Sequence, residues 1–255
     1  MGPCTTGFER SLPHIGRTVL TRPAVLMEEA RGQGGRAAGR TAMKLYDFAF
    51  SPNCRKVRAV AYELGVPLES VHVDLLQGGS RTPAFLAVNP NGRVPVLVDD
   101  DFVLWESTAI LRYLSAKKGG ALVPTSQRGQ AEVDRWLAWQ LAHLGPAMSK
   151  VAFERIVKKL TGQGAPDEAA VAVGSAEFAK LTALLEAALQ SRDYLAGPLS
   201  LADFALAAHY SLASTCGLDI TPYPRVHAWL DRVLARDSMK RALADAQAVM
   251  RPHAA

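Results

Sequence analysis

Apolar runs of strand length alternate with helical patterns between residues 44 and 118. Strand-like runs occupy residues 44–50, 68–75, 94–100 and 102–105. Helical patterns occupy residues 55–64, 82–89 and 106–118, with Gly65 after the first of them and Gly119-Gly120 after the last. Glycine is typical of the position that follows a helix. The order is β-α-β-α-β-β-α, which predicts a small sheet with helices packed on it.

The pattern becomes helical throughout after a connector at residues 120–128. Apolar residues repeat at helical spacing over residues 131–151, with an interruption at Gly145-Pro146, and again over residues 176–190. Two more helices are expected at 199–215, where Ser200 and Asp203 have the spacing of a capping box, and at 223–243. The sequence therefore predicts an α/β domain over residues 43–119, a linker over 120–128 and an all-helical bundle over 129–255.

Residues 1–42 differ in composition from the rest of the chain. They hold seven Gly and three Pro without a sustained apolar period, which favours a disordered extension. Their six Arg also leave an organelle transit peptide open, although the segment has one Ser only and three Glu. A misassigned start is the simpler interpretation, because Met43 stands directly before the first predicted strand.

Charge and composition disfavour several classes of function. The net charge is +5, but the six Arg and three Glu of residues 1–42 supply +3 of it and leave +2 for the rest. The chain has no Lys/Arg stripe interleaved with aromatic residues, which a nucleic-acid surface would need, and no apolar run near the roughly 20 residues that span a bilayer. Its six His form no metal-ligand motif, and its three Cys are far apart. We therefore expect a cytoplasmic protein without metal, nucleic acid or membrane as partner.

Three places in the α/β domain combine polar side chains with free backbone groups. Ser51 stands between a strand and a helix, where its hydroxyl, the first N–H groups and the positive end of the helix dipole favour an anion. Val94-Pro95 favours a cis bond that leaves the Val94 N–H and C=O free to pair with an extended peptide. Glu106-Ser107 open a helix and suit a carboxylate. Each alone also fits a helix cap, an edge proline or a helix start, but their order within one domain favours a ligand site.

Five sequence motifs together point to one known family. They read SPNCRKV, NPNGRVPVL, ESTAILRYL, GPLSLADFALAA and YPRVHAWLDRV. From about Met43 to the C-terminus the chain thus resembles the glutathione transferase family. The resemblance implies a thioredoxin-like α/β domain followed by an all-helical domain, assembled as a homodimer. It also implies transfer of glutathione to small hydrophobic electrophiles, with peroxidase activity as a possible addition.

The resemblance implies a role for each matching residue. Ser51 donates a hydrogen bond to the sulfur of glutathione, and Val94, before Pro95, pairs with the cysteinyl backbone. Glu106 and Ser107 hold the γ-glutamyl end. The other residues implied in glutathione binding are Asn53, Ser80, Arg81, Arg93 and Asp134. Ser80 and Arg81 match the loop that binds the glycyl carboxylate, and Asp134 matches a residue that reaches the ligand of the partner subunit.

The implied chemistry is activation of a thiolate. A free thiol has a pKa of about 8.5, and helix N-termini lower such values to about 3.5–7.5. A shift of about two units, roughly 3 kcal/mol, makes the thiolate the main form at neutral pH. The nucleophile is then bound glutathione, held beside an apolar site for the electrophile. Candidates for that second site, each of which also suits an ordinary core, are Phe50, Trp139, His143, Met148 and Phe153.

The residues around Ser51 leave the class of the protein open. Cys54 occupies the second position of a C-x-x-C whose attacking cysteine is replaced by Ser51, so we expect Cys54 to be inert. The Ser-Pro-Asn run that ends at Asn53 is similar to the nu-like group, which implies glutathione-dependent disulfide reduction, although Cys54 stands where that group has Gly. The zeta-like isomerases carry Ser-Ser-Cys there and are disfavoured. A non-enzymatic protein on the same scaffold is a third interpretation, disfavoured because all three binding features are retained.

Overall fold

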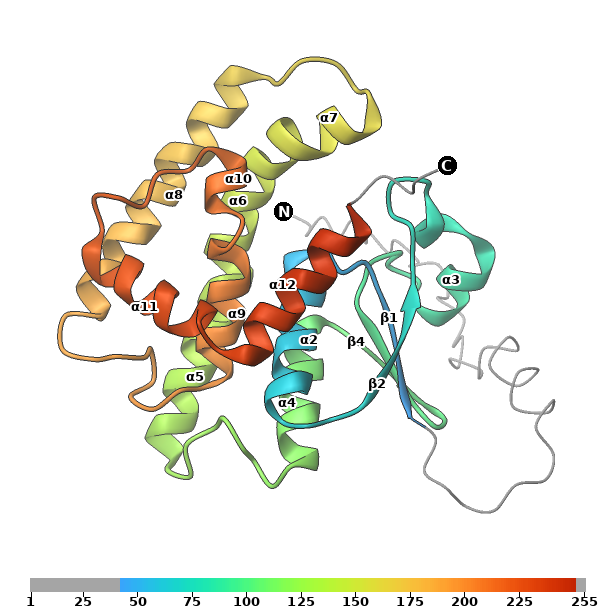
Figure 1. The fold of residues 1–255 in the computed structure, drawn as a ribbon, viewed down its shortest axis with the longest axis horizontal. Helices are drawn as coiled ribbons and strands as arrows, with labels where there is room; N and C mark the ends of the chain where they lie inside the picture. The colour runs from blue at the N-terminus through green and yellow to red at the C-terminus, as the bar shows by residue number, and fades with distance from the viewer. Residues whose placement is uncertain (1–41, 251–255) are drawn as a thin grey trace, which may run out of the picture. The chain divides into compact units, whose positions relative to one another are not determined.

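The computed structural model describes residues 42–250, which contain a four-stranded sheet and a larger set of helices (Figure 1). These residues belong to one unit of the chain, 38–255. The expectations for residues 1–42 therefore lie outside the described residues, apart from Ala42. The fold class expected from the sequence is confirmed, since a small mixed sheet with its helices precedes a region that is wholly helical apart from one isolated bridge.

The sheet has the order β2-β1-β3-β4. Its strands are β1 (Met43–Asp47), β2 (Leu68–His72), β3 (Val96–Asp99) and β4 (Phe102–Trp105). Strands β1 and β2 are parallel, because a helix connects them, and β3 runs antiparallel to both β1 and β4. Leu45 of β1 faces Leu97 of β3 in register, and both side chains are buried.

The helices of the α/β region begin where proline and capping residues place them. They are α2 (Pro52–Glu63), α3 (Pro83–Val88) and α4 (Ser107–Lys117), with a short 3-10 turn η1 (Gly79–Arg81). Helix α2 starts earlier than the expected residue 55, because Ser51 is its N-cap and Pro52 suits the first helical position. Strand β2 ends before the expected residue 75, because the Asp74 carboxylate accepts from the N–H groups of Leu76 and Gln77 and forms a turn.

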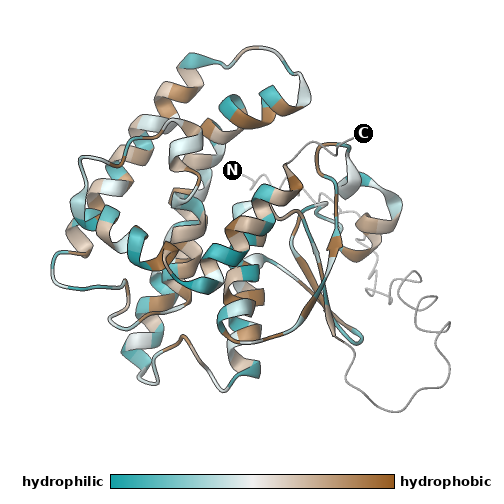
Figure 2. Cartoon of the chain, in the orientation of Figure 1, coloured by the Kyte–Doolittle hydropathy of each residue, from teal (hydrophilic) through white to brown (hydrophobic). Residues whose placement is uncertain are grey.

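The second region consists of helices with two π-turns among them. They are α5 (Gln127–Trp139), η2 (Gln140–Leu144, π), α6 (Gly145–Ala152), η3 (Phe153–Val157, π), α7 (Lys158–Thr161), α8 (Glu168–Ala188), α9 (Leu201–Tyr210), α10 (Ala213–Cys216), α11 (Pro224–Leu234) and α12 (Asp237–Val249). The interruption expected at Gly145-Pro146 is present, as the π-turn η2 that ends directly before Gly145. Hydrophilic and hydrophobic residues alternate along α8 and α12 (Figure 2), as in helices that bury one face.

Several helix boundaries in this region differ from the expected ones. Helix α5 starts at Gln127, inside the linker expected over 120–128, because Ser126 caps it by accepting from the Gly129 N–H. Helix α8 starts ahead of residue 176, because Asp167 caps it by accepting from Ala169 and Ala170. The helix expected over 199–215 is divided into α9 and α10, and the one expected over 223–243 into α11 and α12. The second division falls at Arg236, whose backbone is extended and whose guanidinium pairs with Glu63 of α2. A pair between residues so far apart in the sequence cannot be predicted from the residues next to either one.

Helix α2 is the element that joins the sheet to the helical region. It packs against α4, α9 and α12, and Figure 1 shows α12 running beside it. Its fully buried Val57 and Val60 lie in the same hydrophobic cluster as Phe204 of α9 and Leu45 of β1. Burial of a side chain of this size contributes about 1.5–3 kcal/mol relative to exposure. The position of α2, and of the Ser51 turn before it, is thus set by both regions.

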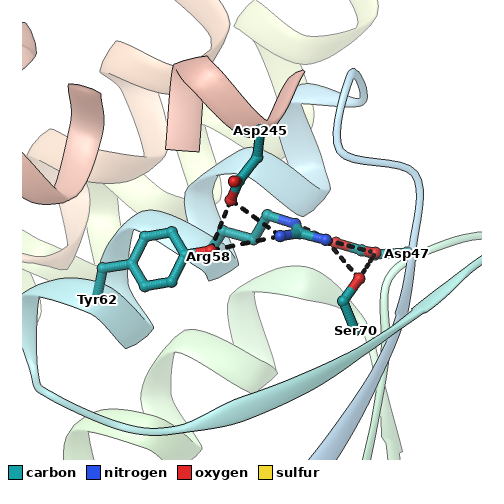
Figure 3. A network of polar contacts seen from close by, with 5 residues as sticks. All are labelled: Asp47, Arg58, Tyr62, Ser70 and Asp245. Atoms are coloured by element: carbon teal, nitrogen blue, oxygen red, sulfur yellow. Dashed lines mark hydrogen bonds and ion pairs between the residues drawn. The ribbon is translucent and has the colours of Figure 1, made fainter. Parts of the chain in front are cut away.

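A polar network fixes the outer side of α2 to α12 (Figure 3). Arg58 of α2 binds the buried Asp47 carboxylate at the end of β1 and, over 2.9 Å, the Asp245 carboxylate of α12. The Tyr62 hydroxyl donates to Asp245 over 2.5 Å, and the Ser70 hydroxyl donates to Asp47 over 2.9 Å. The network therefore ties β1, β2, α2 and α12 together through one guanidinium.

The described helices include none that combines the length and the apolar character needed to cross a membrane.

Candidate functional site

The turn before α2 places the Ser51 hydroxyl at a helix N-terminus without using it as a cap. The Ser51 N–H donates to the Phe48 carbonyl over 2.8 Å, and the Ser51 carbonyl accepts from the N–H groups of Cys54 and Arg55. The side chain caps none of the backbone N–H groups of α2, and the first turn holds no acidic residue. The half-buried Ser51 therefore lies at the positive end of the helix dipole, where its side chain also forms a hydrogen bond with the Cys54 thiol.

A pocket of about 370 Å³ opens at Ser51. Its lining residues are Ser51, Leu75, Gly78, Ser80, Arg81, Gly92, Arg93 and Val94. Five of the site residues expected from the sequence thus share one cavity. The guanidinium groups of the exposed Arg81 and Arg93 give the pocket positive charge, which suits a ligand with carboxylates.

The peptide bond between Val94 and Pro95 is cis, as the sequence predicts. Pro95 precedes β3, and within the described residues neither the N–H nor the C=O of Val94 has a hydrogen-bond partner. The buried Asn89 holds the preceding turn, because its Nδ2 donates to the Arg93 carbonyl over 2.7 Å and its Oδ1 accepts from the Asn91 N–H. The turn therefore presents one free backbone donor and one free acceptor at the pocket.

Gly92 is a lining residue that sequence reasoning did not identify. Its φ is +61°, and a Cβ added there would meet Arg81 Nη1 at 2.7 Å and the Ser80 carbonyl oxygen at 3.0 Å. Only glycine combines this backbone with so close an approach. The Asn-Gly pair at residues 91 and 92 was the available signal, because that pair is typical of turns with positive φ. Leu75 and Gly78 were also missed, and their loop carries no comparable signal.

The start of α4 approaches the start of α2. Ser107 Oγ donates to Asn53 Oδ1 over 3.4 Å, so two helix N-termini converge beside the pocket. Glu106 has φ +71° and ψ 106°, a conformation that a residue with a Cβ rarely adopts. Such strain costs on the order of 1–3 kcal/mol and is found mainly at functional sites. The Glu106 carboxylate is exposed and the Ser107 hydroxyl is buried at the start of α4.

Asp134 is not among the residues that line the Ser51 pocket. It is exposed on α5 and forms an ion pair with Arg112 of α4. Its contact with the ligand of a second subunit stays a prediction.

The five residues expected to line an electrophile site are not gathered in the Ser51 pocket. Trp139 and His143 contact each other, with ring centroids 6.4 Å apart, and His143 is exposed on η2. Phe50 is half-buried and packs against Phe48, while Phe153 is exposed on η3. Met148 is 3% exposed and belongs to the core of the helical region, so it contacts core side chains rather than solvent. A helical stripe in a sequence does not distinguish a core residue from the wall of a site.

Cys54 is inaccessible, as expected from its position in the motif. It is fully buried, and burial together with the charge of Asp47 raises the pKa of its thiol to about 12, against weaker opposing hydrogen bonds with Phe48 and Ser51. A thiol of this kind is neither ionised nor exposed at neutral pH. Within residues 42–250, no group of His, Cys, Asp and Glu side chains is arranged to hold a metal ion.

Comparison with known proteins identifies the family of the chain. Residues 45–121 match the glutathione S-transferase N-terminal domain, and residues 152–232 match the glutathione S-transferase C-terminal domain. Glutathione S-transferase 3 of Zea mays is 37% identical over 212 residues, which cover 79% of this chain and 93% of that protein. Glutathione S-transferase GstB of Escherichia coli K12 is 33% identical over 76% of this chain and 93% of its own length.

A solved structure agrees with these relatives. The theta class glutathione S-transferase from Xanthomonas axonopodis pv. citri, with glutathione bound, superposes with a TM-score of 0.74 at 31% identity, covering 83% of this chain and 98% of that one. The two matched domains, the curated relatives and the shared fold lead to one conclusion: the chain belongs to the glutathione S-transferase family.

Proposed function

We propose that Ser51 carries out the glutathione transfer of this family by donating a hydrogen bond to the sulfur of bound glutathione. The observation that supports this role is the pocket that Ser51 shares with Arg81, Arg93 and Val94. The Ser51 hydroxyl caps no N–H group of α2, and the backbone N–H and C=O of Val94 have no partner within the described residues. A hydroxyl donor and a helix N-terminus both stabilise an anion placed there. The sulfur anion is the species that needs such stabilisation.

The proposed binding mode uses the Ser51 pocket and the start of α4 next to it. The backbone of Val94 pairs with the cysteinyl residue of glutathione, and the γ-glutamyl end binds Glu106 and Ser107, with Asn53 supporting Ser107. The glycyl carboxylate lies against Ser80 and Arg81, with Arg93 beside it. This arrangement places a carboxylate of the ligand near each source of positive charge, and it places the ligand ammonium near the carboxylate of Glu106.

The reaction follows from the stabilised thiolate. Free thiol loses its proton to solvent on binding, and the sulfur then attacks the electrophilic carbon of the second substrate. With an aryl halide, the carbon–sulfur bond forms and the halide leaves with the bonding electron pair. A fall of about two units in the thiol pKa, roughly 3 kcal/mol, raises the thiolate from a minor to the main species at neutral pH.

We further propose an apolar electrophile site beside Trp139 and His143, a homodimer in which Asp134 approaches the second subunit, and a cytoplasmic location. Trp139 is half-buried and His143 exposed, so both offer surface to a small molecule. The buried free thiols of Cys54 and Cys216 suit a reducing compartment.

Steady-state kinetics with glutathione and chlorodinitrobenzene tests the role of Ser51. We expect Ser51→Ala to lower kcat/KM up to about 25-fold at neutral pH, because a thiol pKa about two units higher reduces the thiolate from the main species to a few per cent. Cys54→Ala is the matched control on the same helix, and we expect its kcat/KM to change less than about twofold, because the buried thiol is not ionised. Equal kcat/KM in the wild type and Ser51→Ala would remove Ser51 from the mechanism.

A second activity, disulfide reduction, is favoured by the position of Asn53 at the site. Asn53 follows Ser51 and Pro52 and contacts Ser107. The same thiolate would attack a disulfide sulfur, form a mixed disulfide and release a thiolate, and a second glutathione would complete the reduction. Turnover of hydroxyethyl disulfide well above the conjugation rate would assign this as the main activity, and turnover well below it would assign transfer. A hydroperoxide substrate tests peroxidase activity in the same way.

A further inference from the structure

Arg55 is a buried arginine in the first turn of α2, directly behind the Ser51 turn. The residue is 2% exposed. Burial lowers the pKa of its guanidinium to about 10, so the side chain remains a cation at neutral pH. Its hydrogen-bond partners are two backbone carbonyls and one hydroxyl, and within residues 42–250 no carboxylate forms an ion pair with it. Arginine is almost never fully buried unless it is paired. This unpaired cation therefore requires an explanation.

A contribution to stability does not explain Arg55. Moving a charge from water into the interior is costly, and the cost is repaid only where hydrogen bonds satisfy the remaining donors. The Arg55 Nε is buried and has no hydrogen-bond partner among the described residues. An apolar side chain of similar volume in such a place is often equally or more stabilising. The contacts of the other two guanidinium nitrogens therefore indicate what Arg55 does.

The first of these contacts holds the peptide unit that precedes Ser51. Nη2 of Arg55 donates to the Phe50 carbonyl over 3.2 Å, and this carbonyl belongs to the peptide bond between Phe50 and Ser51. The N–H of the same peptide unit donates to the Phe48 carbonyl over 2.8 Å. A peptide unit is planar, so hydrogen bonds on both of its sides fix the direction in which the chain enters Ser51. The guanidinium also lies 6.0 Å from the centroid of the Phe50 ring, which favours the same arrangement.

The second contact joins Arg55 to the helical region. Its Nη1 donates to Ser211 Oγ over 2.6 Å and approaches the Ala208 carbonyl at 3.5 Å. Ser211 is the C-cap of α9, and its Oγ donates to the same Ala208 carbonyl over 2.8 Å. The carbonyls at the C-terminal end of a helix favour a cation. One guanidinium thus links the peptide unit before Ser51 to the end of α9.

We propose that Arg55 is a positioning residue, which holds the Phe50–Ser51 peptide unit against the end of α9 and thereby directs the Ser51 hydroxyl toward the sulfur of glutathione. The inference rests on the proposed function, in which Ser51 donates to that sulfur. A hydrogen bond weakens steeply as its angle departs from linear, so a Ser51 turn that is free to rotate stabilises the thiolate less. The other proposed contacts of the ligand do not pass through this peptide unit. The role therefore predicts a change in the thiol pKa and in kcat, with little change in the KM for glutathione.

Ultraviolet titration of the glutathione thiolate bound to the enzyme, without an electrophile, tests this role. We expect Arg55→Met to raise the thiol pKa by about one unit, and Arg55→Lys to raise it similarly, because lysine keeps the charge but lacks the fork that binds two partners. In conjugation assays, kcat of Arg55→Met should fall about fivefold near about pH 6.5 and approach the wild-type value above about pH 9, with less than about a twofold change in KM.

Arg236→Met is the matched control. Arg236 also links α2 to the helical region, through Glu63, but it does not contact the peptide unit before Ser51. We expect this variant to keep the wild-type thiol pKa. An equal rise in Arg236→Met and Arg55→Met would show that any loosening of α2 has this effect, and it would overturn the specific role of Arg55.

A double-mutant cycle separates positioning from a direct effect of charge. If Arg55 acts through Ser51, adding Arg55→Met to Ser51→Ala should produce no further rise in the thiol pKa. A further rise as large as that in the single variant would show that the guanidinium charge acts on the sulfur directly, and it would overturn the positioning role.

The outcomes also separate this inference from the proposed function. A wild-type thiol pKa in Ser51→Ala would contradict the proposed function and the inference with it. A raised pKa in Ser51→Ala and a wild-type pKa in Arg55→Met would contradict the inference alone, as would a wild-type pKa in Arg55→Lys. Ser211→Ala provides a milder variant if Arg55→Met does not fold, since it removes only the hydroxyl partner of Nη1. We expect it to raise the thiol pKa by about 0.3–0.5 unit, and an unchanged value would overturn the inference. A purely structural role predicts lower stability with an unchanged thiol pKa.

Discussion

Helices α2 and α9 each follow a serine at the N-cap, and these two serines are used in opposite ways. Ser200 before α9 has no exposed surface, and both its N–H and its hydroxyl donate to the Asp203 carboxylate over 2.9 Å. Ser51 before α2 is half-buried, and its hydroxyl caps no backbone group of the helix. At α9 the serine is bonded to a carboxylate of its own helix, whereas at α2 the Ser51 side chain caps no N–H group and lines a pocket.

The difference lies in what surrounds each helix start. The Asp203 carboxylate also accepts from the Leu195 N–H over 3.0 Å and from Trp229 Nε1 over 2.9 Å. At α2, the corresponding place holds a pocket and two arginines instead of an acidic residue. The N-terminus of a helix favours an anion, and at α2 we propose that the ligand supplies the one that the chain does not.

Asp203→Ala should give the largest effect, because it removes the internal acceptor at the start of α9. Loss of the carboxylate leaves several buried donors without partners, and each such donor costs about 1–3 kcal/mol. We expect the free energy of unfolding to fall by about 4 kcal/mol in urea denaturation. Asp237→Ala, a fully exposed carboxylate in the first turn of α12, is the control and should change it by less than about 1 kcal/mol. Similar losses in both variants would contradict the contrast between the two helix starts.

Gly92→Ala should damage the pocket wall that faces Ser51. A Cβ at this position meets Arg81 and the Ser80 carbonyl, and the positive φ is unfavourable by about 1–2 kcal/mol for a residue with a Cβ. We expect the KM for glutathione to rise about tenfold, with a loss of about 1–2 kcal/mol in stability. Gly162→Ala has a similar φ of +68° but open space around it, so it should lose stability without a change in KM. An unchanged KM in Gly92→Ala would remove this turn from the binding site.

Acidification should affect the α9 side of the molecule through His209. Its pKa is lowered to about 3, mainly by burial, whereas the unfolded chain takes up a proton near the ordinary value of about 6.5. Stability is therefore fully present above about pH 6.5 and falls as the pH drops toward 3, by up to about 1.4 kcal/mol per pH unit. The free energies of unfolding of the wild type and of His209→Gln, measured by urea denaturation, should become more similar as the pH falls over this range. Parallel pH dependence in the two proteins would show that His209 does not titrate as described.

The sequence was informative wherever a feature is local. The strand and helix order, the cis bond at Val94-Pro95 and the capping box of Ser200 and Asp203 follow from neighbouring residues, and the structure confirms them. It also predicted five residues that the structure places around one pocket. These features depend on turn and cap chemistry that a few adjacent residues determine.

The sequence was uninformative where partners lie far apart in the chain. Lys56, Gln140 and His209 are linked by buried hydrogen bonds, yet the neighbours of each residue in the sequence do not indicate these contacts. The expected electrophile residues show the same limit, since Met148 shares a helical period with site candidates but lies in the core. Burial and long-range pairing depend on tertiary packing, which a periodic pattern does not contain.

The thiol pKa of bound glutathione tests most directly whether Ser51 and the N-terminus of α2 stabilise the thiolate of the ligand. Ultraviolet absorbance of the thiolate, titrated against pH in the absence of an electrophile, gives this value for the wild type and for Ser51→Ala. We expect a pKa about two units below the free value of about 8.5 in the wild type, and a return of most of that shift in Ser51→Ala. Equal pKa values in the two proteins would contradict the assignment of Ser51.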